Sequence, residues 1–255
     1  MTKELDTRRL ELEWFLQDLD GNPAGREKVL NLHSKWWTVE DYARILDAAK
    51  ASGTRATFAF LGRDVPHRTE VISRMVDEGH EVVTHGSRHF LFTRQFSRHD
   101  VAQDLSRCVA DLRALGAGAR GLWMCGSERL DREVLAGVAD ADIDWFLSPV
   151  RYVPADVPDG LRHVPSSDYS DLSLLYFREL DVANAMNYFR RTFAEGNNVV
   201  LRFGVLMLAR GPAEVLAGWT AFLQECSGGV PVGEWEAGGP RPAIYFDASN
   251  HLGWP

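Results

Sequence analysis

Two histidines four positions apart are the residues of this chain whose types and spacing best fit chemistry. A short apolar stretch, residues 82–83, predicts a strand that ends in His85, and His89 follows four residues later. Four residues make about one helical turn, so a chain that turns helically after this strand presents both imidazoles on one face. With a carboxylate from another segment, they would make a divalent metal site of the open, catalytic type. Histidine pairs at this spacing also occur by chance, so the surrounding elements must decide the interpretation.

A pair of aspartates offers such a carboxylate. Residues 10–18 alternate and then turn apolar, which predicts a strand, and the Gly, Asn and Pro of residues 21–23 predict a turn after it. Asp18 and Asp20 therefore stand at the carboxyl end of the first predicted strand. Active groups gather at the carboxyl ends of strands in parallel sheets. We thus expect both aspartates and both histidines at one edge of the sheet.

Strands and helices alternate along the rest of the chain. Further strands are predicted at residues 57–61, 82–85, 121–124, 143–147 and 198–205, and helices at residues 39–49, 71–76, 97–112, 134–138, 183–194 and 212–225. Residues 149–171 are the least regular region, and the Gly- and Pro-rich tail from residue 227 is either an ordered arm or loose. The alternation predicts an α/β fold of βαβ units around one parallel sheet or barrel, in a single domain of residues 1–255.

The composition is typical of a globular protein with a large core and narrows the range of partners. Of its 255 residues 45% are hydrophobic, and the formal net charge of −8 argues against nucleic acid or an anionic membrane as the main partner. The sequence shows neither the apolar segment of a signal peptide nor an apolar run of about 20 residues. Three cysteines, Cys108, Cys125 and Cys226, match no zinc-finger or disulfide pattern. We expect a cytoplasmic protein that acts on a soluble small molecule.

One block of the chain resembles a known family. Residues 57–62 read Thr-Phe-Ala-Phe-Leu-Gly, residues 79–89 read Gly-His-Glu-Val-Val-Thr-His-Gly-Ser-Arg-His, and a helix with an acidic cap follows. This block resembles the polysaccharide deacetylase (NodB-homology) superfamily, carbohydrate esterase family 4, most clearly from residue 57 to about residue 115. The resemblance implies a distorted β/α barrel. The usual first motif, Thr-Phe-Asp-Asp-Gly, is absent, and residues 18–21 (Asp-Leu-Asp-Gly) resemble instead the Asp-x-Asp variant of the branch with cyclic-imide-hydrolase-like and peptidoglycan-deacetylase-like members.

The resemblance also implies roles for four residues. It makes Asp18 the catalytic base and makes Asp20, His85 and His89 the ligands of one divalent metal ion. Two histidines and one carboxylate with an open fourth position suit hydrolytic zinc, although cobalt, nickel or iron would also be accepted. Members of this branch often form oligomers, so the resemblance leaves a homo-oligomer open.

Two of the family's other motifs are altered in this chain. Trp123 and Met124 stand where the family has the arginine that orients its base, and Arg202 follows Leu201 where the family has a histidine that protonates the leaving amine. Candidates for a replacement proton donor are Arg88, His163 and Asp168. Candidate substrate-binding residues are Arg88 and three tryptophans that could stack on a ring, although core packing would use the same side chains: Trp36, Trp37 and Trp123.

These features lead to three hypotheses about function. The first is a metal-dependent hydrolase of a non-peptide C–N bond that removes the acetyl group from a small soluble N-acylated amino sugar or biosynthetic intermediate. The second is ring opening of a cyclic imide or ureide, whose leaving nitrogen needs less protonation. The third, from a different class, is a degenerate member of the family that keeps the barrel and binds a metal or ligand without turnover.

Overall fold

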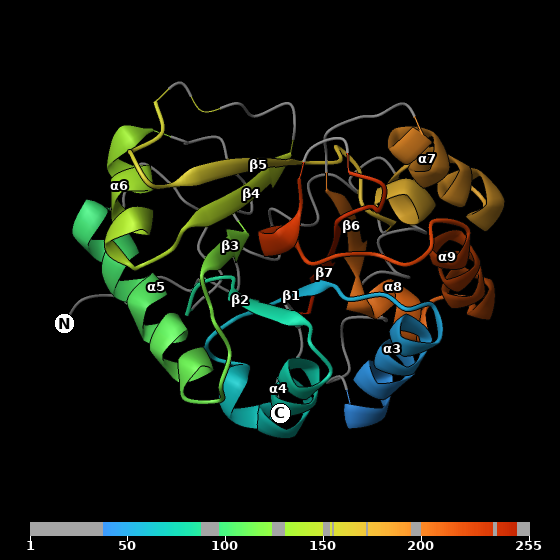
Figure 1. Ribbon diagram of the computed structural model, residues 1–255, viewed down its shortest axis with the longest axis horizontal. Helices are drawn as coiled ribbons and strands as arrows, with labels where there is room; N and C mark the ends of the chain where they lie inside the picture. Colours follow the sequence, from blue (N-terminus) through green and yellow to red (C-terminus); the bar gives the residue numbers. More distant parts are fainter. Residues whose placement is uncertain are drawn as a thin grey trace.

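The computed structural model describes residues 38–87, 97–123, 131–149, 154, 156–171, 173–194, 200–236 and 239–248. Within these residues, seven strands form one sheet in the order β5-β4-β3-β2-β1-β7-β6, and all neighbours pair in parallel. The strands are β1 (Thr57–Phe60), β2 (Glu81–Thr84), β3 (Gly121–Trp123), β4 (Trp145–Pro149), β5 (Arg162–Ser166), β6 (Leu201–Gly204) and β7 (Ile244–Asp247). A parallel bridge between Ser166 and Val200 joins the two outer strands, so the sheet closes into a nearly complete barrel (Figure 1).

Helices surround this barrel on most of its circumference. In Figure 1 they follow one another around the strands from α6 and α5 through α4 and α3 to α8, α9 and α7. Their bounds are α3 (Val39–Ala51), α4 (Thr69–Asp77), α5 (Arg98–Arg113), α6 (Arg132–Asp140), α7 (Val182–Ala194), α8 (Val205–Arg210) and α9 (Ala213–Glu225), with short helices η1 (Val65–His67), η2 (Ser173–Phe177) and η3 (Val232–Glu234). The arrangement confirms the expected α/β fold, a distorted β/α barrel of NodB-homology type.

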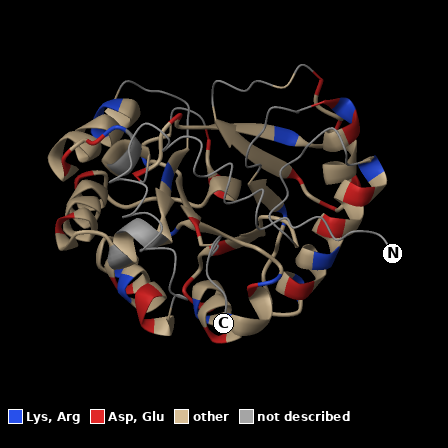
Figure 2. Ribbon diagram, turned by 180° about the vertical axis from the view of Figure 1, so that it is seen from behind, with Lys and Arg blue, Asp and Glu red and all other residues tan. Residues whose placement is uncertain are grey.

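Acidic and basic residues gather on these outer helices (Figure 2). In the part of the chain that the structure describes, no helix is both long and apolar enough to cross a membrane.

Alternation along each strand separates two buried layers. On β7, Ile244 and Phe246 belong to the layer beneath the helices, whereas Tyr245 belongs to the layer inside the barrel. Phe246 shows how the outer layer packs, since its ring lies 4.7 Å from that of Phe58 on β1 and 5.3 Å from that of Trp219 on α9. Burying one such side chain contributes about 1.5–3 kcal/mol. The alternation on β7 means that neighbouring residues of one strand point to opposite sides of the barrel wall.

Side-chain caps determine where several helices begin. Thr38 and Ser97 each accept a hydrogen bond from the backbone N–H three residues later, and the Asp41 and Asp100 carboxylates each accept one from the backbone N–H of the cap residue. Each reciprocal pair satisfies two N–H groups that the first turn leaves without partners inside the helix. These caps explain why α3 begins at Val39 and α5 begins at Arg98.

Three elements differ from the sequence-based expectation. Strand β5 lies within residues 149–171, which the sequence marks as the least regular region, and β7 lies in the tail from residue 227. The strand expected at residues 198–205 is assigned at Leu201–Gly204, and α8 begins at Val205. The first predicted strand, residues 10–18, lies outside the described residues.

The amino end of the barrel is filled by a carboxylate that the chain itself binds. Glu81 points inward at the start of β2, and its Oε2 accepts hydrogen bonds from Thr57 Oγ1 at 2.5 Å and from the Gly233 backbone N–H at 2.9 Å. Val232 N–H donates in turn to Thr57 Oγ1 at 2.8 Å, which ties η3 across this end. Burial raises the pKa of Glu81, while hydrogen bonds from Thr57, Gly233 and Trp145 oppose that rise.

Candidate active site at the carboxyl end of the barrel

His85 is the predicted site residue that the structure places most clearly. It directly follows β2 at the carboxyl end of the barrel, is only 2% exposed, and donates its backbone N–H to Phe60 O at 2.8 Å. Its Nδ1 lies 3.0 Å from the carbonyl oxygen of Trp123 at the end of β3. A carbonyl oxygen can only accept, so Nδ1 carries the hydrogen and Nε2 keeps the lone pair that a metal ion requires. His85 therefore fits a metal-ligand role.

The turn after His85 is held in place by the neighbouring strand and helix. Gly62 N–H donates to Gly86 O at 2.8 Å, which links this turn to the end of β1. Ser87 N–H donates to Asp104 Oδ2 on α5 at 2.7 Å, and Ser87 Oγ donates to Asp104 O at 2.5 Å. A Cβ at Gly62 would lie 2.9 Å from Ser87 Cα, so this close approach requires glycine. The backbone that carries His85 is fixed before any ligand binds.

An arginine and two aromatic rings fill the barrel beside His85. The Arg202 guanidinium lies 4.6 Å above the ring centroid of Trp123, and the Trp123 and Tyr245 rings are 5.4 Å apart. Arg202 Nε donates to Ser167 O at 3.1 Å and its Nη2 donates to Asp168 O at 2.9 Å. Trp123 is only 5% exposed, and its ring packs between Arg202 and Tyr245. Trp123 therefore positions the Arg202 guanidinium at the mouth of the barrel.

Sequence reasoning noted Arg202 only as a substitution and missed it as a member of the site. The signal was the alternation of β6, in which Leu201 and Phe203 belong to the outer apolar layer. Arg202, between them, must then face the barrel interior.

Two aspartates follow β5 near the same edge. Asp168 Oδ1 is buried without a hydrogen-bond partner among the described residues, and Asp171 is fully buried and accepts Gly204 N–H at 2.9 Å.

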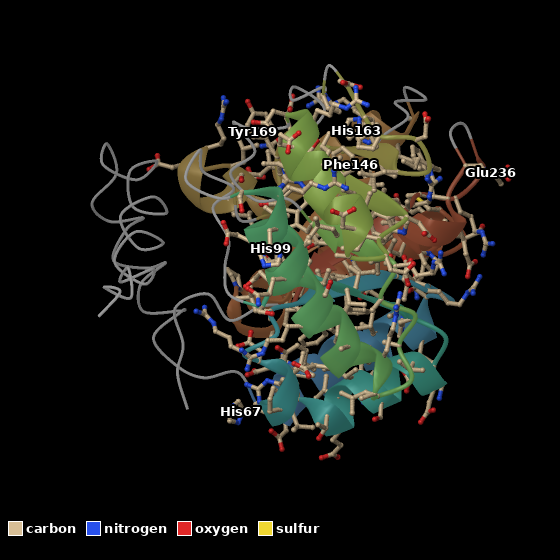
Figure 3. All side chains as sticks on the ribbon, turned by 90° about the vertical axis from the view of Figure 1, so that its left-hand side faces the viewer. His67, His99, Phe146, His163, Tyr169 and Glu236 are labelled. Atoms are coloured by element: carbon tan, nitrogen blue, oxygen red, sulfur yellow. The ribbon has the colours of Figure 1, made fainter. Side chains whose placement is uncertain are left out.

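His163 and His80 have local roles. His163 lies on the outer side of β5, where its Nε2 is 2.8 Å from Ser148 Oγ and its ring is 5.0 Å from that of Phe146 (Figure 3). Burial lowers its pKa. Because it faces away from the barrel interior, it is unsuited as the proton donor. His80 Nδ1 accepts Ala56 N–H at 3.1 Å and holds the turn before β2, and burial lowers its pKa to about 4.

The remaining predicted site residues lie outside the described residues, namely Asp18, Asp20, Trp36, Trp37, Arg88 and His89. Among the residues that are described, no group of three or more His, Cys, Asp or Glu side chains is placed to hold a metal ion. Cys108 is buried and donates weakly to Phe60 O at 3.6 Å, and burial raises its pKa to about 12. A thiol so protonated is no nucleophile. A metal site that included His85 would therefore need ligands from residues that the structure does not describe.

Comparison with known proteins agrees with this architecture. Residues 26–145 match the family model described as polysaccharide deacetylase. The fold is similar to that of a Mycobacterium smegmatis protein described as a polysaccharide deacetylase, with 18% identity, TM-score 0.61 and coverage of 73% of this chain and 70% of that one. A search of curated proteins found no match.

Two further structures with similar folds carry different descriptions. One is an allantoinase, at 19% identity and TM-score 0.60, covering 72% of this chain and 65% of that one. The other is a carbohydrate esterase family 4 pseudoenzyme from Bacillus anthracis, at 16% identity and TM-score 0.55, covering 83% of this chain and 66% of that one. The chain thus corresponds to about two thirds of the length of these two proteins.

The barrel and the matched region agree with the resemblance found in the sequence. Residues 26–145 are similar to polysaccharide deacetylases, and the fold is similar to that of the three solved structures. Placement in the Asp-x-Asp branch stays a prediction, because its motif at residues 18–21 lies outside the described residues.

Proposed function

We propose that this protein is a metal-dependent hydrolase of a non-peptide amide bond, with Asp20, His85 and His89 as ligands of one divalent ion, zinc by the chemistry of the donor set. The observation that carries the proposal is the orientation of His85, whose Nδ1 is 3.0 Å from Trp123 O at the carboxyl edge of a parallel barrel. A backbone carbonyl behind an imidazole is a common support for a ligating histidine.

The protein's residues would divide the reaction among themselves. A bound divalent ion would supply an acidified water and a polarised amide carbonyl. The hydrogen bond to Trp123 O would hold the His85 ring in one tautomer. The resemblance assigns Asp18 to take the proton of the attacking water. As the C–N bond breaks, that proton passes to the leaving nitrogen, and the products are an amine and a carboxylic acid, which loses the water's second proton to the solution.

The substrate that we propose is a small soluble N-acylated amino sugar or biosynthetic intermediate, from which the enzyme removes an acetyl group. Arg88 and the tryptophans Trp36, Trp37 and Trp123 are the proposed contacts around it. A cytoplasmic location and a single catalytic domain belong to the same proposal. The negative formal net charge of −8 supports a small molecule rather than nucleic acid as the ligand.

One observation favours a second substrate class. Arg202, on the inner face of β6, is held over Trp123 and hydrogen-bonded to two carbonyls. A guanidinium stays protonated in proteins and is a poor proton donor to an amine. A cyclic imide or ureide, whose leaving nitrogen needs little protonation, would suit such a site.

A binding role without turnover is the third candidate, and one structure of similar fold is described as a pseudoenzyme. The experiment that separates all three begins with metal analysis of the purified protein. Release of acetate from an N-acetyl amino sugar and ring opening of a cyclic imide are then measured on the same preparation. Asp18→Asn is the control for both reactions. Metal binding with no hydrolysis of either substrate would support the binding role.

A further inference from the structure

Strand β7 brings an aspartate to the candidate site that sequence reasoning did not consider. This strand lies between β1 and β6, and its last residue, Asp247, pairs with Ala59 on one side and with Gly204 on the other. All these pairings are parallel. Asp247 therefore stands at the carboxyl edge of the barrel, the same edge as His85.

The side chain of Asp247 points into the barrel. Ile244 and Phe246 of the same strand belong to the outer apolar layer, and Tyr245 lies inside against Trp123. Residues two apart on a strand share a face, so Asp247 shares the inner face with Tyr245. Ala59, its partner in register on β1, also belongs to the inner layer.

The register also relates Asp247 to His85. Ala59 pairs with Asp247 on β7 and with Val83 on β2, so these three residues form one row across the sheet. His85 follows Val83 by two residues on the same inner face. Strands about 4.8 Å apart and a rise of about 3.3 Å per residue put the two Cα atoms roughly 12 Å apart. Inward-pointing carboxylate and imidazole groups can approach one water molecule from that separation.

The backbone around Asp247 is held firmly. Ala248 N–H donates to Ala59 O at 3.1 Å, and the buried Tyr42 hydroxyl of α3 donates to Ala248 O at 2.8 Å. Burial raises the pKa of Tyr42, and the negative charges of Asp64 and Asp247 add to that rise, while Arg68 opposes it. A carboxylate on so rigid a backbone is suited to proton transfer, which needs a fixed position.

We propose that Asp247 is the proton-transfer residue of the site that contains His85. The inference rests on the proposed hydrolase function and changes only which carboxylate moves the proton. As the water oxygen bonds to the amide carbon, an Asp247 oxygen takes the water's proton. As the C–N bond breaks, the same proton passes to the nitrogen, so the products are again one amine and one carboxylic acid, which loses the water's second proton to the solution.

The first test compares an aspartate whose loss should lower kcat with one whose loss should leave kcat unchanged. Asp247→Asn keeps shape but removes the basic oxygen, and it should lower kcat by 100-fold or more with unchanged zinc content. Asp144→Asn is the control, because Asp144 precedes β4 at the amino end and forms a surface ion pair with Arg120. Asp18→Asn is measured beside them. A wild-type kcat for Asp247→Asn, or a loss of zinc from it, would overturn the proton-transfer role.

The second test does not use turnover. In cobalt(II)-loaded protein, the visible absorption changes with pH as the bound water loses its proton, and Asp247→Asn should shift the pH of that change while Asp144→Asn should leave it as in wild type. Full cobalt content with a wild-type pH dependence in Asp247→Asn would overturn the placement of Asp247. If the shift is present while wild-type protein hydrolyses no amide, the proposed function fails and the placement stands. A protein that binds no divalent metal and hydrolyses no amide overturns both.

Discussion

The two ends of the barrel treat their inward-pointing polar groups in opposite ways. At the amino end, the Glu81 carboxylate is bound by Thr57 and by a backbone N–H of η3, which crosses that opening. At the carboxyl end, the protein holds the backbone of its polar residues and turns His85, Arg202 and Asp247 toward the interior. The first arrangement uses polar groups to close the barrel, and the second positions them for a ligand. Inward polarity alone therefore does not mark a site.

The largest expected effect is at the carboxyl end. His85→Ala should weaken zinc affinity by roughly 100-fold or more, because it removes a ligand whose orientation the Trp123 carbonyl fixes. His163→Ala is the matched control, since that imidazole lies outside the barrel wall. Competition with a chromophoric chelator measures both affinities. Equal zinc affinity in the two variants would remove His85 from the site.

The next effect concerns the amino end and stability. The pKa of His80 is lowered to about 4, so the unfolded chain binds a proton that the folded protein does not. Stability from this group is full above pH 6.5 and is lost as pH falls toward 4, by about 3 kcal/mol. His80→Asn should flatten this part of the pH dependence of the free energy of unfolding, measured in urea. His99→Asn, at an exposed position, should keep the wild-type slope.

A smaller effect separates two inward arginines. Arg202→Lys keeps the charge but loses the paired hydrogen bonds to Ser167 O and Asp168 O and the guanidinium stacking, and we expect about a tenfold lower kcat/KM. Arg162→Lys is the counterpart at the amino end, where Arg162 donates to Val232 O and Trp235 O. It should stay within twofold of wild type. Equal losses in both variants would mean that the two ends do not differ.

The smallest effect is expected for Glu81→Gln. Burial raises the pKa of Glu81, so the folded state favours its protonated form, and its contribution to stability is present at low pH and is lost as pH rises through the folded-state pKa. Glutamine can accept the same two hydrogen bonds without a charge. The variant should therefore be at least as stable as wild type at pH 7, by up to about 1 kcal/mol, with unchanged turnover. Loss of turnover would make Glu81 part of the site.

Much of the barrel could be predicted from local patterns. Residues 57–61 and the strand into His85 are apolar runs between helices with clear caps and stops, and the structure contains them as β1 and β2. The position of His85 at a strand end follows directly. Strand β5 could not be found this way, because Arg162, His163 and Pro165 weaken the apolar signal and its pairing with β4 stabilises it.

Long-range pairing explains what sequence reasoning missed in the site. Residues 244–247 are apolar enough for a strand, but only the pairing with β1 and β6 shows that Asp247 belongs to the edge that carries His85. Arg202 likewise is recognised as part of the site only through its contact with Trp123, which is 79 positions earlier in the chain. Contacts over such separations leave no periodic signal in a single sequence.

The place of β7 in the sheet also affects the order in which this protein can assemble. Strands β1 to β5 are neighbours in chain order and can pair one after another as they are synthesised. Among the described residues, strand β6 pairs with β7 and otherwise gains only the bridge near Val200, and one edge of β1 has no described neighbour until β7 has been made. Within the described part of the sheet, this apolar strand edge is therefore covered only late in translation, and chaperones that shield such edges would act on the nascent chain before then.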